Sequence, residues 1–334
     1  MSSARAAVTI VNGLTKPWAP VEYPTATKVL KAALAQGANL WNGGMHYGTP
    51  EANSLHLLKY YFEQYPEDAS KVVLSIKGAF GARTGPDGSP EGIRASVDEA
   101  VKVLGGTKTI DIFECARVDP KVPIETSIGA LAELVKEGKI GGIGLSEVSA
   151  ATIRKAHAVH PIAGVEVELS LFTPDPLHNG IVETCHERPR KNTMGEAFSN
   201  GGNTVGIPII AYSPISRGWL TGELRKLDDL PADDFRRILP RFQPAVFDQN
   251  FKLVEAVERI AKRKGVTTSQ VAIGWVVAQG AIPIPGSARV ERVVENTNAA
   301  ALTDAELAEI QTMLNTLPIG GERYGGAQEK FLNA

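Results

Sequence analysis

The stretch Ile110–Leu145, IDIFECARVDPKVPIETSIGALAELVKEGKIGGIGL, contains one complete example of the pattern that organises this chain. Its first apolar run, Ile110–Phe113, predicts a buried strand, and Ile140–Leu145 predicts a second one. Between them the amphipathic stretch Ile124–Glu137 predicts a helix that ends at Gly138. A helical crossover is the usual connection between two parallel strands. The stretch therefore predicts a strand–helix–strand unit with parallel strands.

The same alternation continues along nearly the whole chain. Six further apolar runs predict strands, namely Val8–Val11, Asn39–Trp41, Val72–Ile76, Ala163–Val167, Pro208–Tyr212 and Ala281–Ile284. Helices are predicted between or after the strands, over Thr25–Gln36, Ala52–Gln64, Glu91–Leu104, Ala150–Ala158, Leu253–Lys264 and Ser269–Gln279. Strands without a polar face indicate a parallel sheet covered by helices. Eight such units predict an α/β fold, a (β/α)8 TIM barrel, as one domain over residues 1–334.

Glycine patterns argue against a Rossmann domain. Such a domain carries GxGxxG between an early strand and its helix, and no such motif follows an early strand here. Gly142-Ile143-Gly144 lacks the third glycine and lies inside a predicted strand. We interpret it as a site of tight packing.

Three segments interrupt the alternation of strands and helices. Gly78–Pro90 and Ser213–Phe247 follow strands, so we expect both at the catalytic face of the barrel, where long loops often act as lids. Residues 187–205 precede a strand and lack periodicity, which predicts a surface insertion on the opposite face. A subunit contact and retained non-coding sequence are the two alternatives for this insertion.

Composition excludes several classes of protein. The 334 residues are 43% hydrophobic, enough for a large core, and the net charge of −2 favours neither nucleic acid nor an anionic membrane. No apolar run is long enough to span a bilayer, and the N-terminal residues lack the apolar core of a signal peptide. Cys115 and Cys185 allow neither a disulfide framework nor a cysteine-rich metal site. We expect a cytoplasmic protein without a metal, and the oligomeric state stays open.

The segment IPGSARVERVVEN, residues 284–296, has the composition of an anion site. A strand ends in Pro-Gly, and we expect a helix to open at Ser287, with free N–H groups and the positive dipole end directed at a ligand. Arg289 and Arg292 can bind a phosphate, while Glu295 and Asn296 can accept from an adenine amino group. The segment suits NADP(H) rather than NAD(H). The alternative is a capped helix with solvated arginines.

Two residues at neighbouring strand ends form a candidate proton donor. Tyr47 follows the Asn39–Trp41 strand and Lys77 ends the next strand. A phenol has a pKa of about 10, which is high for a proton donor at neutral pH, and a nearby ammonium lowers it. Tyr47 and Lys77 are thus a candidate general-acid pair for carbonyl reduction. The alternative is that Tyr47 packs in the barrel mouth and Lys77 is a solvated strand end.

Further strand-end residues could contact a nicotinamide. Tyr212 could stack on the ring, or pack in the core. Ser146 and Glu147 could hydrogen-bond the carboxamide. The alternative is that this segment caps the following helix, a role that Ser146 or Ser149 could equally fill.

Six motifs give the chain a resemblance to the aldo-keto reductases, and most closely to the fungal pyridoxal reductases among them. They are WNGGMHYG, VVLSIKG, IDIFECARVDP, GGIGLSEVS, IPIIAYSPISRGWLTG and IPIPGSARVERVVEN. The resemblance covers the chain outside residues 1–12 and 187–205. It implies a (β/α)8 barrel that binds NADPH across its C-terminal face. The nicotinamide would donate hydride to a carbonyl while a tyrosine supplies the proton.

The resemblance also implies roles for individual residues. Tyr47 would be the acid, Lys77 its activator, and Tyr212 the residue stacked on the nicotinamide. Ser146 would hold the carboxamide, with Glu166 in the place of the usual glutamine. The remaining cofactor contacts would come from two motifs, through Ser213, Pro214, Gly218, Leu220 and Gly222 at the pyrophosphate and Ser287, Arg289, Arg292, Glu295 and Asn296 at the adenosine 2′-phosphate and adenine.

Three positions depart from the family pattern. Asn42 stands where the family has an aspartate, so it can offer Lys77 a hydrogen-bond acceptor but no charge. Ala116 replaces a histidine, and losing such a donor to the carbonyl oxygen costs on the order of 3 kcal/mol. Glu147 replaces an asparagine and can still accept from the carboxamide. His46, next to Tyr47, is expected to line the pocket.

The expected activity is NADPH-dependent reduction of a small aldehyde, pyridoxal to pyridoxine. This would place the protein in vitamin B6 metabolism. Two alternatives are a broad-specificity aldehyde reductase and an NADPH-binding regulatory barrel with little turnover. The departures at Asn42 and Ala116 favour the regulator, and the absence of a long partner-binding extension disfavours it. The retained Tyr47 and Lys77 argue against a third alternative, a catalytically silent barrel.

Overall fold

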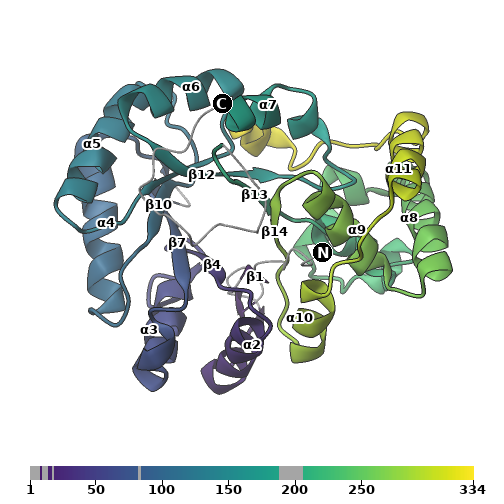
Figure 1. Ribbon diagram of the computed structural model, residues 1–334, viewed down its shortest axis with the longest axis horizontal. Helices are drawn as coiled ribbons and strands as arrows, with labels where there is room; N and C mark the ends of the chain where they lie inside the picture. The colour runs from purple at the N-terminus through teal and green to yellow at the C-terminus, as the bar shows by residue number, and fades with distance from the viewer. Residues whose placement is uncertain (1–7, 10–13, 17–18, 82–83, 188–205) are drawn as a thin grey trace.

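Eight parallel strands form the centre of the molecule in a computed structural model, which describes residues 8–9, 14–16, 19–81, 84–187 and 206–334. The strands follow chain order around the sheet, and β1 and β14 lie side by side, so that the sheet closes into a barrel (Figure 1). The predicted TIM barrel is confirmed. The strands are β1 (Val8–Thr9), β4 (Leu40–Gly44), β7 (Val73–Gly78), β10 (Ile112–Cys115), β11 (Ile143–Ser146), β12 (Ile162–Glu168), β13 (Ile209–Tyr212) and β14 (Ile282–Ile284).

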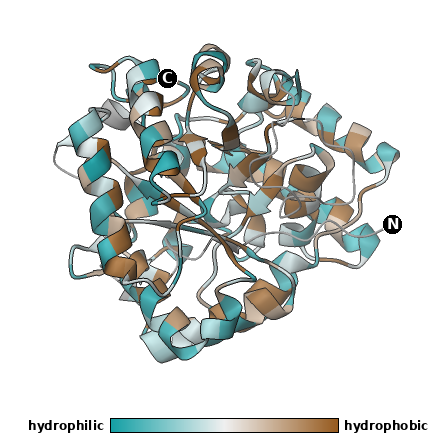
Figure 2. Ribbon diagram, turned by 60° about the vertical axis from the view of Figure 1, so that its left-hand side comes forward, coloured by the Kyte–Doolittle hydropathy of each residue, from teal (hydrophilic) through white to brown (hydrophobic). Residues whose placement is uncertain are grey.

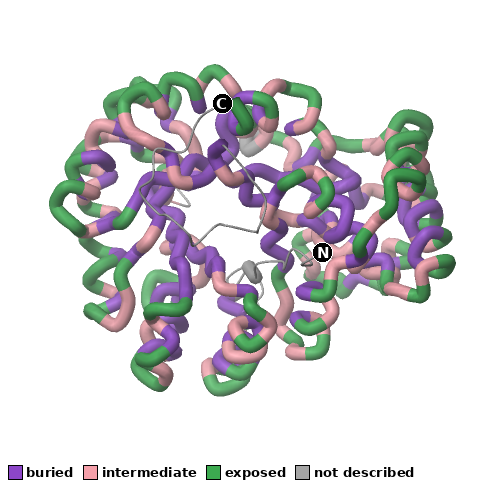
Figure 3. The backbone as a smooth tube through the Cα atoms, in the orientation of Figure 1, coloured by how far each residue is buried: buried purple, intermediate pink, exposed green. Residues whose placement is uncertain are grey.

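Helices surround the strands and face them with their apolar sides (Figures 1 and 2). Their inward surfaces are buried and their outward surfaces exposed, as Figure 3 shows. The helices are α2 (Tyr23–Ala35), α3 (Ser54–Gln64), α4 (Pro90–Leu104), α5 (Ile124–Lys136), α6 (Ala150–Val159), α7 (Ile181–Glu187), α8 (Pro244–Lys264), α9 (Thr268–Ala278), α10 (Val290–Thr297) and α11 (Asp304–Thr316).

Helix α4 shows how the sequence sets such boundaries. The Ser89 hydroxyl accepts from the Gly92 N–H at 3.1 Å, and Pro90 occupies the first helical turn. Gly105 ends the helix in the left-handed region, at φ 60°. These signals lie in the sequence itself, which is why the predicted and observed helix agree to within one residue.

Two helices and two boundaries differ from the sequence-based expectation. Helices α7 and α11 were not predicted, and α8 begins at Pro244 rather than at Leu253. Helix α10 begins at Val290, because the Ser287 hydroxyl accepts from the Arg289 N–H at 3.0 Å and forms a local turn before the helix. The expectation of a helix opening at Ser287 was therefore wrong.

Both long loops on the catalytic face carry structure of their own. The segment after β7 forms a small ribbon from β8 (Phe80–Gly81) and β9 (Gly85–Pro86). The segment after β13 contains four 3-10 turns, η4 (Ser216–Thr221), η5 (Leu227–Asp229), η6 (Phe235–Ile238) and η7 (Pro240–Phe242). The predicted insertion at 187–205 lies, apart from Glu187, outside the described residues.

Inside the barrel an apolar layer changes to a polar one. Leu40, Val73 and Ile112 belong to a buried apolar cluster within the ring of strands. Alternate residues of a strand face the same side, so Asn42 follows Leu40 into the interior and Glu114 follows Ile112. The polar layer lies toward the C-terminal ends of the strands. It is the floor of the candidate site.

Two further observations concern membrane-spanning helices and the two cysteines. None of the helices within the described ranges is long and apolar enough to cross a membrane. Cys115 and Cys185 are unpaired, and burial raises the pKa of both thiols to about 12.

Candidate active site

Lys77 lies in a cluster of buried polar side chains inside the barrel. Its Nζ is 3.0 Å from Glu114 Oε1 and also forms an ion pair with Glu166. Asn42 Nδ2 donates to Glu166 Oε2 at 2.8 Å. All four residues are buried, with no more than 2% of the surface of each exposed. Lys77 is therefore held from two directions, and the interpretation of Lys77 as a solvated strand end is wrong.

Two members of this cluster differ from the expectation. Glu166 was placed at the cofactor carboxamide, but its Oε2 contacts Lys77 and Asn42. Asn42 was expected to accept a hydrogen bond, and it donates one because a carboxylate oxygen can only accept. Glu114 was not predicted at all. Its signal was available, since it lies two residues after the interior-facing Ile112 and pairs in register with Lys77.

Tyr47 lies in the turn that follows β4, close enough to this cluster for the charges of Lys77 and Glu166 to act on its phenol. A Cβ at Gly44 would lie 2.8 Å from the tyrosine ring, so glycine lets the ring fold back over the strand end. The Tyr47 carbonyl accepts from the Ser54 N–H at 3.0 Å and from the Thr15 hydroxyl at 3.1 Å. These contacts hold the turn at the barrel mouth.

The phenol of Tyr47 is a weaker acid than expected. Burial raises the pKa of Tyr47 to about 12, and the neighbouring charge of Lys77 lowers it by a smaller amount. The expected effect of Lys77 is present, but desolvation outweighs it. The phenol is therefore protonated at neutral pH, which is the form that a proton donor requires.

His46 packs beside Tyr47. Its ring centroid is 4.2 Å from that of Tyr47 and 5.5 Å from that of Phe80. Burial lowers the pKa of His46 to about 3, helped by the charges of Lys77 and Arg117. A neutral imidazole between two rings agrees with the expected lining role.

Arg117 is a functional candidate that sequence reasoning missed. It follows Ala116 and donates to the Ala116 carbonyl at 2.6 Å. No carboxylate within the described part of the chain forms an ion pair with it. Its charge acts on Tyr47, Tyr212 and Glu147. A cation thus stands beside the position where the family has a histidine.

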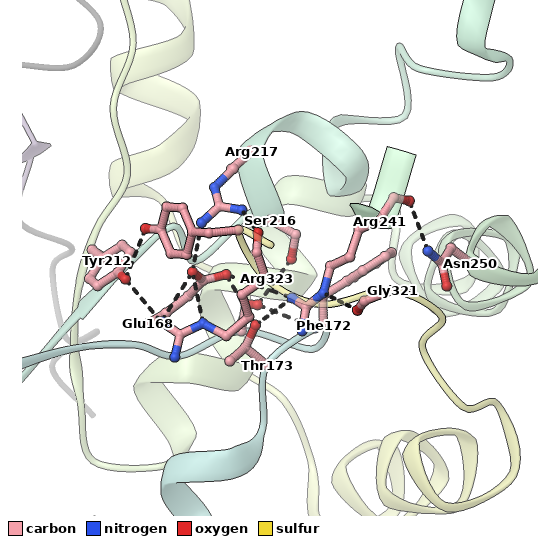
Figure 4. Close-up of polar contacts among 12 residues, drawn as sticks. Glu168, Phe172, Thr173, Tyr212, Ser216, Arg217, Arg241, Asn250, Gly321 and Arg323 are labelled. Atoms are coloured by element: carbon pink, nitrogen blue, oxygen red, sulfur yellow. Dashed lines mark hydrogen bonds and ion pairs between the residues drawn. The ribbon is translucent and has the colours of Figure 1, made fainter. Parts of the chain in front are cut away.

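A second cluster joins the C-terminal segment to the barrel mouth (Figure 4). Arg323 donates to Glu147 Oε1 at 2.8 Å and to the Tyr212 hydroxyl at 2.9 Å. Arg217 donates to Glu168 Oε2 at 2.9 Å, and Arg323 approaches the same oxygen at 3.3 Å. Sequence reasoning missed Glu168 and both arginines, because the partners lie 49 to 176 positions apart in the chain.

Ser146 and Glu147 retain capacity for a ligand. Ser146 Oγ and Glu147 Oε2 are buried without a hydrogen-bond partner among the residues that the structure describes. The helix cap comes from Ser149, whose hydroxyl accepts from the Thr152 N–H at 3.2 Å. Because buried polar atoms nearly always have a partner, the pair fits a ligand such as a carboxamide, which both donates and accepts.

The loop after β13 carries unusual backbone. Ser213, Ser216 and Arg217 have φ between 51° and 54°, and Gly218 has φ 100°. Side-chain-bearing residues rarely adopt this region, and such residues cluster at functional sites. The N–H groups of Gly218 and Leu220 donate to the Ile215 carbonyl, and Gly222 follows with φ 76°. Pro214 lies within the same turn.

The predicted phosphate-binding arginines share an unforeseen partner. Glu223, which follows the η4 turn, contacts Arg292 and lies 3.3 Å from Arg289. Arg292 also contacts Glu295, whose other oxygen accepts from Thr267 at 2.7 Å. Asn296 is buried and Ser287 forms the turn before α10. The structure brings this group together and links it to the loop after β13.

Comparisons with known proteins match this architecture. The aldo/keto reductase family model matches residues 10–315. The chain is 40% identical to the probable pyridoxal reductase 2 of Schizosaccharomyces pombe, over 96% of this chain and 95% of that protein. It is 36% identical to aldo-keto reductase str7 of Strobilurus tenacellus, over 89% and 83%. A glycerol dehydrogenase from Gluconobacter oxydans shares the fold, with a TM-score of 0.78 and 22% identity over 95% and 97%. The chain belongs to the aldo-keto reductase family.

Proposed function

We propose that the protein reduces an aldehyde with NADPH and that pyridoxal, reduced to pyridoxine, is its substrate. The observation that carries the proposal is a protonated, half-buried phenol, that of Tyr47, close enough to the buried ammonium of Lys77 for that charge to act on it. The relative of 40% identity is named a probable pyridoxal reductase, which supports the choice of aldehyde.

Separate parts of the chain would hold the cofactor. Ser146 and the free oxygen of Glu147 fit the carboxamide, and the ring of Tyr212 fits the nicotinamide face. Arg289 and Arg292 fit a 2′-phosphate, which would share or displace Glu223. The bound cofactor would supply hydride to the carbonyl carbon. The preference for NADPH over NADH rests on the two arginines.

The protein's own contribution is the proton. Tyr47 would donate its phenolic proton to the carbonyl oxygen as negative charge develops there. The phenolate that results is stabilised by the ammonium of Lys77, whose charge favours ionisation of Tyr47. Burial of the cluster excludes water and strengthens this interaction.

Arg117 supports a substrate with an acidic hydroxyl beside the aldehyde. A partly buried guanidinium without a carboxylate partner is costly unless an anion binds it. Pyridoxal carries a phenolic hydroxyl on the ring carbon next to its aldehyde. Arg117 would bind this oxygen and draw the aldehyde toward Tyr47, in the space left by Ala116.

An assay of NADPH oxidation tests the proposal. Pyridoxal is compared with 3-deoxypyridoxal, which lacks only the ring hydroxyl, in wild type and Arg117→Met. We expect wild type to prefer pyridoxal by up to about tenfold in kcat/KM, as for one hydrogen bond, and the variant to lose that preference. Equal use of both aldehydes by wild type would indicate a broad reductase. NADPH binding without turnover of either would indicate a regulator.

A further inference from the structure

The family aspartate that pairs with the active-site lysine is absent, yet Lys77 has two carboxyl partners. Glu114 comes from the neighbouring strand β10, and Glu166 comes from β12 on the far side of β11. Neither glutamate stands at the position of the missing aspartate. That position lies on β4 and is occupied by Asn42. The cation is thus paired by strands that lie on the other side of β7 from β4.

The intervening strand provides the space for this arrangement. Gly144 of β11 lies opposite Glu114 in the strand register. A Cβ at Gly144 would lie 3.2 Å from Glu114 Cβ and 3.3 Å from its Oε2. The carboxyl of Glu114 therefore lies over the glycine and points across β11 toward Glu166. A larger residue at position 144 would push Glu114 away from Lys77.

Asn42 complements these carboxyls better than an aspartate would. Its Nδ2 donates to the Glu166 oxygen that also contacts Lys77. An aspartate at the same place would present only acceptors to a carboxylate and repel it. The asparagine is therefore matched to Glu166.

The charges in the cluster favour a shared proton. One ammonium and two ionised carboxylates would bury a net negative charge, which is unfavourable in a low-dielectric interior. With one carboxyl protonated the cluster is neutral, as a single lysine–aspartate pair is. Burial and the proximity of Glu166 raise the pKa of Glu114 to about 8, which places that proton on Glu114 at neutral pH.

We propose that Glu114 and Glu166 together replace the missing aspartate, as positioning residues that hold Lys77 within reach of Tyr47. They act through Lys77 and touch neither substrate nor hydride. The proposal rests on the proposed function for the identity of Tyr47 as the acid, but the pairing itself is independent of any substrate. The competing role for Glu166 is the carboxamide contact that the family pattern suggests.

A double-mutant cycle between positions 42 and 166 tests the pairing through stability. Asn42→Asp adds a third carboxyl and should lower Tm by several degrees, as should Glu166→Gln, which removes a partner of Lys77. Asn42→Asp combined with Glu166→Gln restores two carboxyls, so its Tm should exceed that of either single variant. Additive losses would overturn the proposal. This readout holds even if no aldehyde is reduced.

Glu168→Gln is the matched control. Glu168 lies on the same strand, is equally buried and is also ion-paired, but its partners are Arg217 and Arg323. Asn42→Asp should not rescue Glu168→Gln. Rescue there would show that the added carboxyl acts nonspecifically.

A second pair of variants covers the case in which Glu166→Gln does not fold. Asn42→Asp is then combined with Glu114→Gln, which restores the same number of carboxyls. Additive losses count against the proposal in the same way.

Cofactor binding and turnover separate the two roles of Glu166. As a positioning residue, Glu166→Gln should lower kcat by roughly tenfold to a hundredfold and leave the NADPH Kd within about twofold. Asn42→Asp should restore part of kcat in that background. An altered NADPH Kd with an unchanged kcat would assign Glu166 to the carboxamide instead. Absence of turnover in wild type would refute the proposed function but not the pairing, which the stability cycle decides.

Discussion

The barrel mouth holds two buried charged clusters of opposite balance. In the first cluster the ammonium of Lys77 is paired with two carboxyls. In the second, Glu168 and Glu147 are paired with three arginines, namely Arg217, Arg241 and Arg323. Glu166 and Glu168 are two residues apart on β12 and face the same side. The pKa of Glu114 in the first cluster is raised, while in the second the arginines outweigh burial and lower that of Glu168. One strand thus contributes to a cluster that holds a proton and to an anchor that is ionised at neutral pH.

Breaking the arginine cluster should have the largest effect. Arg323→Met leaves Glu147 buried without its cation and removes one partner of Glu168. We expect the free energy of unfolding in urea to fall by about 3–5 kcal/mol. Arg94→Met is the control, since its pair with Glu137 is exposed and screened by water, so its loss should hardly change the free energy of unfolding. Equal losses for the two variants would contradict this view of the cluster.

Removing the acid tests the other cluster. Tyr47→Phe deletes one hydroxyl, so Tm and NADPH affinity should persist while kcat falls by roughly a hundredfold or more. Tyr324→Phe, which deletes the hydroxyl 3.1 Å from that of Tyr212 in the arginine cluster, should change kcat far less. Near-normal turnover by Tyr47→Phe would move the proton-donor role to another group.

The cofactor arginines lie apart from both clusters and should affect one cofactor only. Arg292→Ala would remove the proposed charged contact to the 2′-phosphate, worth roughly 1.5–3 kcal/mol, so NADPH affinity should fall by about tenfold or more. NADH affinity, measured by the same fluorescence titration, should hardly change. Glu223→Gln should strengthen NADPH binding slightly, because it removes a competing carboxylate. A parallel loss of both cofactors in Arg292→Ala would argue against phosphate recognition.

The opposite pKa shifts of Glu114 and Glu168 predict different dependences of stability on pH. A carboxyl whose pKa is raised to about 8 binds its proton more tightly in the folded state, so stability should decline as pH rises from about 5 to 8. Glu114→Gln should remove that decline, measured by urea unfolding across the range. Glu168, whose pKa is lowered, contributes stability that disappears only at acidic pH, so Glu168→Gln should leave the decline in place.

The sequence predicted the barrel well because each strand and helix is encoded locally. The strand positions follow from apolar runs, and caps such as Ser89 and Gly105 lie within the helices' own sequence. Helix α10 was misplaced by a serine turn that resembles a cap. Helices α7 and α11 were missed and α8 begins nine residues before its predicted start, but these errors leave the order of the strands intact.

Long-range polar partners were less predictable. Asn42 and Glu166 are 124 positions apart, and nothing in either segment indicates that a barrel interior brings them together. The family pattern placed Glu166 at the cofactor because it assumes the glutamine and aspartate of other members. Once Asn42 replaces that aspartate, Lys77 becomes available to Glu166. Glu223 and Arg323 escaped notice for the same reason, since their partners lie in distant segments.

The two cysteines make this chain a convenient background for site-specific labelling. A thiol reacts as its thiolate, and the pKa of both Cys115 and Cys185 is raised to about 12 by burial. A single cysteine introduced at an exposed position should therefore react alone with a maleimide dye. Placed at the exposed Glu322, beside Arg323, such a dye would report in real time whether the C-terminal segment stays docked while cofactor and aldehyde come and go.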